Sequence, residues 1–491
     1  MKAPRPLAMS RALPVLPRPL VLALAAALAG CAVGPDYQRP AAPVPTVYKE
    51  ATTAAGATWL PAAPADALDR GPWWRLFDDA ELDRLMPQVA SANQNVAVAV
   101  ASYRQAQALV REARAARFPT LGVSASARRS GGRNTPEVNA FGVSLDGGWA
   151  PDLWGRLGRG VESAQASAEG SAADLANARL SAQGELATDY FSLREADAEV
   201  ALLQRTIEGY ERSLLITRNR YDAGIVPRTD VLQAETQLFS TRADMASLRA
   251  DRARYEHAIA VLVGQPPGSF SIAEAPWRQS VPAVPLGLPS ALLQRRPDIA
   301  AAERQVVVAN AQIGIERAAW FPSLNLSASL GNNASGLGNL FSASTALWSL
   351  GVGAAQTVFD AGAIAARVES AEAGREAAVA RYRQTVLAAF QSIEDQLSSA
   401  RALAEQAELR KQASDAADQT EQQILNRYRA GQVSYTDVVT AQASALSARR
   451  ATVQVAVNRQ VAAIALIQAL GGGFDTAAPE ALRPAVTPAA P

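Results

Sequence analysis

The sequence has little of what most enzymes use. Its 491 residues include one histidine and one cysteine, and 47 Lys and Arg balance 46 Asp and Glu. One cysteine cannot form an internal disulfide, and with one histidine it cannot complete the usual ligand sets of a zinc site. A net charge near zero gives no basic field that would gather nucleic acid. We therefore expect a protein that is not an enzyme, has no metal or cofactor and binds no nucleic acid.

Proline is missing from two long windows. None lies between Asp152 and Val226, or between Ser323 and Ala478. Because a proline costs about 3 kcal/mol inside a helix, these windows, which are rich in Ala, Gln, Glu and Arg, predict very long helices. No run of 18 apolar residues follows the first 30 residues, so no transmembrane helix is expected.

Residues 1–30 have the pattern of an export signal. Four basic residues precede an apolar stretch from Leu20 to Leu28, which is too short for a permanent membrane span. The sequence Leu28-Ala29-Gly30-Cys31 then matches the cleavage site of bacterial lipoproteins. We expect Cys31 to become the first residue and to carry a diacylglycerol and an N-acyl chain. The alternative is an ordinary signal peptide and a buried free cysteine. Ala32, where an aspartate would resemble an inner-membrane retention signal, favours the outer membrane.

The rest of the chain contains an internal repeat of about 200 residues, which is too long for a solenoid unit. The segment 115–121 aligns with 318–324, and 219–224 aligns with 426–431. Each half predicts a helix of about 35 residues, a β-hairpin, a long helix, a Gly-containing turn and a second helix of about 35 residues. At 1.5 Å per residue each long helix measures about 100 Å, which no compact core requires.

These elements predict six segments. The signal peptide is 1–30, and 31–79 is an N-terminal tail and equatorial segment. The first repeat, 80–262, holds a β-hairpin at 119–149 and helices at 155–221 and 228–262. The linker is 263–289, and the second repeat, 290–470, holds a β-hairpin at 321–358 and helices at 362–428 and 435–470. A tail follows at 471–491.

The hairpins alternate apolar with small polar residues. In 323–330, for example, three leucines and an alanine alternate with asparagine and serines. Strands of this kind suit an outer-membrane barrel, although a soluble sheet with one wet face is the alternative. Aromatic residues near the strand ends resemble an interfacial girdle: Phe118, Trp149, Trp154, Trp320, Phe321 and Trp348. Four strands are too few to close a barrel, and open edges are not tolerated in lipid, so three copies would form twelve strands.

The sequence resembles the outer-membrane factors, the TolC-like channels of tripartite efflux pumps, in their lipoprotein branch. The resemblance rests on Cys31 to Tyr37 with Arg39-Pro40, on Trp73 to Asp79, on Arg296 to Ile299 and on the two Arg-Tyr-x-Ala-Gly turns. It implies an α+β membrane protein: a trimeric 12-stranded β-barrel in the outer membrane that continues into a long 12-helix periplasmic α-barrel. The tails and the 263–289 linker would form an equatorial belt.

The resemblance also implies a function and partners. The homotrimer would be a passive exit duct that receives substrates from an inner-membrane pump, of the resistance–nodulation–division type, through a periplasmic adaptor, or membrane fusion protein. A periplasmic adaptor or scaffold that forms no pore is the alternative function. An adaptor would have one helical hairpin between soluble β-domains, whereas helices and hairpins are duplicated here.

The resemblance places candidate sites at the ends of the long helices. The turns would dock the adaptor, through Tyr221 and Gly224 in the first half and Tyr428 and Gly431 in the second. Asp437 and its counterpart Asp230 would narrow the entrance, and Arg427 and Arg429 would pair with these acids as a lock. Plain helix turns, and an aspartate that complements the helix dipole, are the alternatives.

Overall fold

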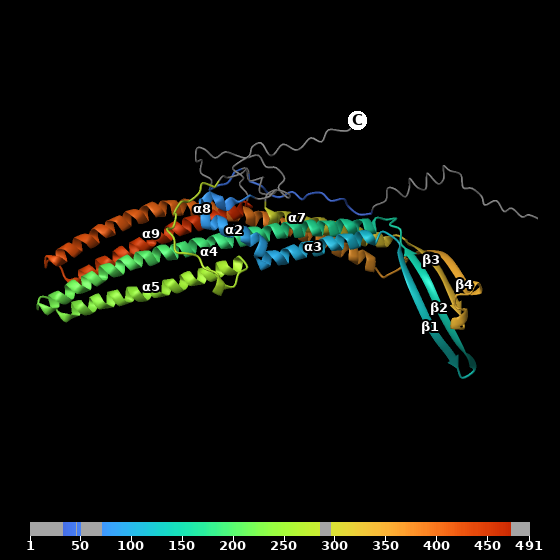
Figure 1. The fold of residues 1–491 in the computed structure, drawn as a ribbon. Helices are drawn as coiled ribbons and strands as arrows, with labels where there is room; N and C mark the ends of the chain where they lie inside the picture. Colours follow the sequence, from blue (N-terminus) through green and yellow to red (C-terminus); the bar gives the residue numbers. More distant parts are fainter. Residues whose placement is uncertain (1–32, 46, 51–70, 285–295, 473–491) are drawn as a thin grey trace, which may run out of the picture. The chain divides into compact units, whose positions relative to one another are not determined.

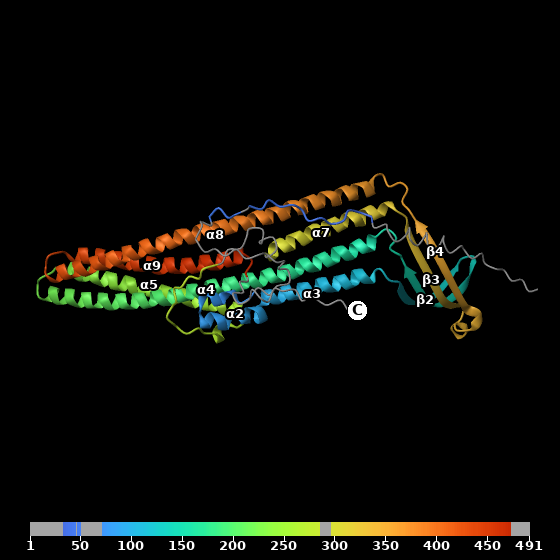
Figure 2. The ribbon, with the colours of Figure 1, turned by 90° about the horizontal axis from the view of Figure 1, so that it is seen from above.

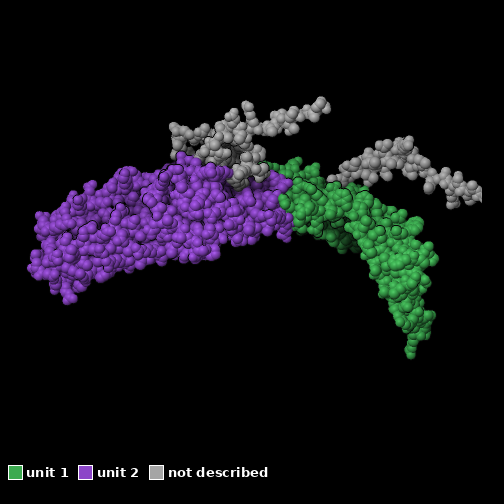
Figure 3. Space-filling view, in the orientation of Figure 1, with its two compact units in different colours: residues 1–39, 106–168, 305–378 green, residues 40–105, 169–304, 379–491 purple. Residues whose placement is uncertain are grey.

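The computed structural model describes residues 33–45, 47–50, 71–284 and 296–472. Cys31 and the signal segment lie outside the described residues. The chain divides into two compact units, residues 1–39, 106–168 and 305–378 in one and residues 40–105, 169–304 and 379–491 in the other (Figure 3). Each unit takes segments from both halves of the repeat, so the two sequence repeats are not two separate domains.

The first unit contains one antiparallel sheet of four strands. The strands are β1 (Thr120–Gly132), β2 (Thr135–Trp149), β3 (Ser323–Ala334) and β4 (Ala346–Ala355), in the order β1-β2-β3-β4 (Figure 1; the last three are also labelled in Figure 2). Both expected hairpins form. They join into one sheet because β2 of the first repeat pairs with β3 of the second.

The register of the sheet places apolar and polar residues on opposite faces. Val123 lies opposite Leu145, Leu145 opposite Leu330, and Leu330 opposite Trp348. In the next row Asp146 lies opposite Gly122 and Ser329, where it accepts hydrogen bonds from the hydroxyls of Ser124, Ser144 and Ser329 at 2.7–3.1 Å. Directly opposed residues share a face, so the alternation expected from the sequence produces one apolar and one polar surface.

Aromatic residues tie the strand ends to the adjoining helices. The Trp154 ring stacks on Phe321, with 4.8 Å between centroids, and its Nε1 donates to the Pro322 carbonyl at 2.7 Å. Nε1 of Trp149 donates to the Arg117 carbonyl at 3.0 Å. Both indole N–H groups are therefore satisfied, and Trp154 also has a ring contact, as aromatic residues at a membrane interface do.

Two long helices dominate the fold (Figure 1). Helix α4 spans Arg156–Asp222 and α8 spans Ala363–Arg429, 67 residues each, and both begin and end one residue later than expected. An aspartate precedes each helix and accepts from its first backbone N–H groups: Asp152 from Leu157 and Gly158, and Asp360 from Gly362 and Ile364. These bonds satisfy donors that have no partner within the helix.

The shorter helices are α2 (Ala80–Ala92), α3 (Gln94–Ala115), α5 (Arg228–Leu262), α7 (Pro297–Arg317) and α9 (Tyr435–Ala469), with short 3-10 turns between elements. The expectation of one helix of about 35 residues before the first hairpin is wrong. That helix breaks at Asn93, whose extended backbone (ψ 126°) separates α2 from α3. The Asn93 side chain accepts from the N–H groups of Asn95 and Val96 and donates to the Leu262 carbonyl at 3.0 Å. None of the described helices is long and apolar enough to cross a membrane.

In the second unit, α2 and the 3-10 turn before it pack on α4. The 3-10 turn Trp73–Phe77 places Phe77 5.0 Å from Phe191, measured between ring centroids. Asp79 caps α2 by accepting from the N–H groups of Glu81 and Leu82, and it also accepts from the Tyr190 hydroxyl at 2.7 Å. A sequence segment that resembles the family therefore has a structural role in starting α2 against α4.

The linker after α5 lies against the helices of the second unit. The Gln460 side chain on α9 accepts from Nε1 of Trp277 and donates to the carbonyls of Arg278 and Ser280. Arg194 of α4 and Arg252 of α5 donate to the carbonyls of Ala273 and Ile272. These bonds satisfy backbone groups of a segment that has no regular structure.

Arg194 and Arg252 both form ion pairs with the buried carboxylate of Asp197. Asp197 contacts Arg194 Nη1 at 2.8 Å and Arg252 Nε at 2.6 Å, and the side chains of Asp197 and Arg194 are 5% and 4% exposed. Removing one member of a buried ion pair leaves an uncompensated charge, which costs more than the pair itself contributes. The position of the linker therefore depends on Asp197.

We predict that Asp197→Ala lowers the free energy of unfolding by about 3–5 kcal/mol, because two arginines lose their buried partner. Thermal unfolding followed by circular dichroism measures the loss. The control is Asp251→Ala on α5, which removes an exposed pair with Arg254 and is expected to cost about 0–1 kcal/mol. Equal losses in the two variants would contradict the prediction.

Candidate functional site

Two helix turns of the same design lie together at one end of the second unit (Figure 1). Gly224 ends α4 at φ 72°, and Gly431 ends α8 at φ 75°. In each turn the glycine N–H donates to the carbonyl three residues before it, and the next N–H donates to the carbonyl five residues before it, at 2.8–2.9 Å. Glycine is needed at both positions because this left-handed conformation is strained for other residues.

Arg220 of the first turn clamps the second turn. Its Nη1 donates to the Tyr428 carbonyl at 2.7 Å, and its guanidinium lies 4.7 Å from the centroid of the Tyr428 ring. The sequence analysis named Arg427 and Arg429 as partners of the entrance aspartates and missed Arg220. The signal was present, because Arg220 and Arg427 are equivalent in the repeat, but the repeat does not show which of the two crosses to the other turn.

The two tyrosines of the turns have different environments. Tyr221 is 41% exposed, whereas Tyr428 is 4% exposed and packs edge-to-face on Tyr435, with 5.3 Å between centroids. The expectation that Tyr428 forms part of a docking surface is therefore wrong, because its side chain is buried between the helices in this structure. Burial, together with the neighbouring Tyr428, raises the pKa of Tyr435 to about 12.

Asp437 is engaged in a capping box at the start of α9. Its carboxylate accepts from the backbone N–H and the hydroxyl of Ser434, at 3.0 and 2.8 Å, and its own N–H donates to the Ser434 hydroxyl oxygen at 3.4 Å. The alternative interpretation, an acidic residue that stabilises a helix start, is thus correct at least in part. Asp437 stays exposed, so its charge also faces the solvent at the turns.

Asp230 has no such cap, because Pro227 stands where Ser434 stands in the second half. Its side chain is half-buried. Burial raises the pKa of Asp230 above the ordinary aspartate range, and the nearby Arg220 acts in the opposite direction. The two equivalent aspartates therefore carry their charge in different surroundings.

The arginines that were expected to form a lock do not reach these acids within one chain. Arg427 is exposed, and Nη1 of Arg429 donates to the Asn426 side chain at 3.4 Å. In the described residues no ion pair joins either arginine to Asp230 or Asp437. Pairing between chains stays a prediction. Over the same described ranges, no group of His, Cys, Asp and Glu residues is placed to hold a metal ion.

All four helices of the second unit that reach these turns share one hydrophobic cluster. It includes Leu214 of α4, Leu238 of α5, Tyr428 of α8 and Val438 of α9. The turns are thus rigidly supported from inside, while Tyr221 and Ile225, 41% and 63% exposed, present apolar surface outward. An exposed apolar surface beside charged groups is typical of a protein–protein contact.

Comparisons with known proteins agree with the repeat and the fold. A family model described as "Outer membrane efflux protein" matches residues 85–265 and 288–472, one stretch in each half. The cation efflux system protein CusC of Escherichia coli O6:H1 (strain CFT073) is 29% identical over 460 residues, which cover 93% of this chain and 98% of CusC.

One further relative and one solved structure also match most of the chain. The pyoverdine export outer membrane protein OpmQ of Pseudomonas aeruginosa is 30% identical over 431 residues, covering 85% of this chain and 90% of OpmQ. The solved structure of the outer-membrane channel OprN superposes with a TM-score of 0.80 at 33% identity, over 90% of this chain and 99% of that one.

We predict that Arg220→Ala loosens the paired turns. The loss of one charge-assisted hydrogen bond and one cation–π contact is worth about 1–3 kcal/mol, so amide exchange in 215–232 and 424–438 is expected to accelerate about 10- to 100-fold. Hydrogen-exchange mass spectrometry measures this. Arg427→Ala, at the equivalent exposed position, is the control and is expected to leave exchange unchanged. Similar acceleration in both variants would exclude the clamp.

Proposed function

Because the chain belongs to the outer membrane efflux protein family and is an outer-membrane channel of a tripartite efflux system, we propose that it is a passive exit duct. In this proposal an inner-membrane pump hands substrates to the duct through a periplasmic adaptor. The predicted fold class, localisation and channel function are confirmed. The pump and the adaptor are proposals. The lipoprotein-branch resemblance supports a pump of the resistance–nodulation–division type.

The sheet edges carry the proposal of a trimer. Strands β1 and β4 are the two edges of the four-stranded sheet, so each has a row of backbone groups without a partner strand among the described residues. In lipid every such group needs a hydrogen-bond partner, and closure into a barrel supplies it. Three chains would pair β1 of one with β4 of the next and close twelve strands, with the apolar face toward lipid and the Asp146 face toward the lumen.

The N-terminal segment supports a lipid anchor on Cys31. Val33 N–H donates to the Trp154 carbonyl at 3.0 Å, and Asn310 donates to the Pro35 carbonyl at 2.8 Å. Val33 follows Cys31 by two positions in the sequence and is hydrogen-bonded beside the aromatic pair Trp154 and Phe321 at the strand ends. We propose that the diacylglycerol and the N-acyl chain enter the membrane there. The intact mass of the mature protein tests this, because an unmodified cysteine would exclude it.

The paired turns are proposed as the periplasmic entrance. Three copies would bring three Asp437 and three Asp230 side chains around the axis. These negative charges would attract cations and would repel one another. The docking surface would be formed by Tyr221, Gly224 and Gly431, without the buried Tyr428. CusC is described as a cation efflux protein and OpmQ as a pyoverdine export protein, yet both have about the same sequence identity to this chain. This supports the proposal that the pump, rather than the duct, selects the cargo.

We predict that Asp437→Ala raises single-channel conductance in planar bilayers at least about twofold, because side chains that narrow the entrance are shortened, and lowers cation preference, because three negative charges are removed. The matched control is Ser434→Ala, which breaks the same capping box but keeps the carboxylate. It is expected to conduct like the parent. Unchanged conductance and selectivity in Asp437→Ala would contradict the assignment of Asp437 to the entrance. A parent protein that does not conduct would exclude the duct itself.

We predict that Tyr221→Asp weakens co-purification of the adaptor at least about tenfold, because a charge enters an apolar contact. Ser247→Asp, at an exposed position of α5 away from both turns, adds the same charge and is the control, which is expected to leave adaptor recovery unchanged. Adaptor recovery that is equal in the Tyr221 variant and the parent would exclude Tyr221 from the docking surface.

A further inference from the structure

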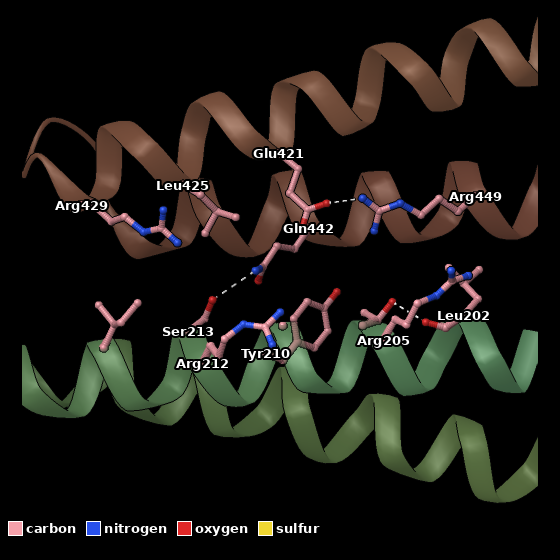
Figure 4. A pocket seen from close by; sticks show the side chains of 13 residues that line it. Leu202, Arg205, Tyr210, Arg212, Ser213, Glu421, Leu425, Arg429, Gln442 and Arg449 are labelled. Carbon is pink, nitrogen blue, oxygen red and sulfur yellow. Dashed lines mark hydrogen bonds and ion pairs between the residues drawn. The ribbon is translucent and has the colours of Figure 1, made fainter.

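A cavity of about 480 Å³ lies between α4 on one side and α8 and α9 on the other (Figure 4). It lies within the second unit, between residues 202–216 of α4 and residues 421–449 of α8 and α9. The cavity lies beside the paired turns and shares Arg429, the last residue of α8, with the second turn. Its walls come from both halves of the repeat.

The cavity is lined by four arginines and one glutamate. Arg205 and Arg212 are seven residues apart on α4, and therefore share one face of that helix. From the opposite wall come Arg429 and Arg449. Arg449 is neutralised, because it contacts Asp418 at 2.8 Å and Glu421 at 2.7 Å.

The other three arginines are exposed, and their guanidinium groups have no carboxylate partner among the described residues. In the part of the chain that the structure describes, neither Arg205 nor Arg212 forms an ion pair, and Arg429 contacts an amide oxygen of Asn426 at 3.4 Å. Positive charge that is concentrated at a concave site, with donors on both walls, suits an anion with several oxygens.

A buried polar group also points to a ligand. Gln442 is 2% exposed, and its Nε2 donates to the Ser213 hydroxyl at 3.5 Å. Its Oε1 has no hydrogen-bond partner among the described residues. Turning the amide by 180° exchanges its two ends but still leaves one without a partner. A buried polar atom without a partner is costly, and a hydroxyl group of a ligand would satisfy Oε1.

The ligand would lie where few hydrogen bonds and ion pairs join α4 to α8 and α9. The Gln442 to Ser213 bond there is long, whereas Arg220 holds Tyr428 at 2.7 Å nearer the turns and Arg450 contacts Glu199 at 3.2 Å on the other side. An anion that contacts α4 and α8 together would link the two halves of the repeat at this level.

We propose that this cavity binds a small polyanion that carries a hydroxyl group, such as a hydroxypolycarboxylate or hydrogen phosphate. Its anionic oxygens contact Arg212 and Arg429, which Figure 4 shows on either side of Gln442, and its hydroxyl donates to Gln442 Oε1. Binding holds α4 against α8. The site is independent of the exit-duct proposal, because it is formed within one chain and requires no pore.

Isothermal titration calorimetry of the full-length protein in detergent, in a buffer without phosphate, tests the site. Citrate is expected to bind once per chain with a Kd of about 0.1–1 mM. Tricarballylate has the three carboxylates without the hydroxyl and is expected to bind about tenfold more weakly. Inorganic phosphate, titrated in parallel, distinguishes the two oxygen chemistries. Binding of either citrate or phosphate that is weakened by Arg212→Gln supports the site.

Three variants separate the contacts. Arg212→Gln is expected to weaken citrate about tenfold, and Gln442→Leu to abolish the preference for citrate over tricarballylate. The control is Arg179→Gln, which removes an exposed arginine of α4 outside the cavity and is expected to change the affinity less than twofold. Circular dichroism verifies that each variant is folded.

Two results would overturn the proposal. One is the absence of heat with citrate and with phosphate up to about 10 mM in the parent protein. The other is equal weakening by Arg179→Gln and Arg212→Gln, which would mean diffuse attraction of anions to the helices rather than a site.

Discussion

The satisfaction of backbone hydrogen bonds in lipid is the constraint on which this structure depends. Four strands form one amphipathic sheet, but in the part of the chain that the structure describes β1 and β4 leave two open edges. Water can satisfy such edges and a hydrocarbon interior cannot. The register that aligns Val123, Leu145, Leu330 and Trp348 on one face therefore makes sense for strands that close with those of further chains. Association into a closed barrel follows from this requirement.

The helices meet a different requirement, which is length with support from inside. Two 67-residue helices bury little on their own, and their stability comes from packing against α2, α5 and α9 and from buried polar contacts. Asp197 is central among these contacts because it holds one arginine from α4 and one from α5, and both arginines also bind the linker. The same linker satisfies Gln460 of α9. A segment without regular structure thus ties together three helices.

The paired turns show how a sequence repeat becomes asymmetric. The family model matches each half once, and both turns have the same glycine geometry. Nevertheless Arg220 crosses to the second turn while Arg427 is exposed, and Tyr428 is buried while Tyr221 is not. Each half packs against the other rather than against a copy of itself, so equivalent residues face different neighbours. The charged cavity near Gln442 arises in the same way, from walls that belong to different halves.

The sequence alone determined the bounds of the long helices, the two hairpins and the amphipathic faces of the strands, because proline, glycine and alternation act locally. It did not reveal the break at Asn93, since that residue is held by the distant Leu262 carbonyl. It also could not tell that Tyr428 is inaccessible or that Arg220 is the clamp. Only the tertiary structure decided these, because burial and pairing depend on which helix lies opposite, and the repeat makes both choices look the same.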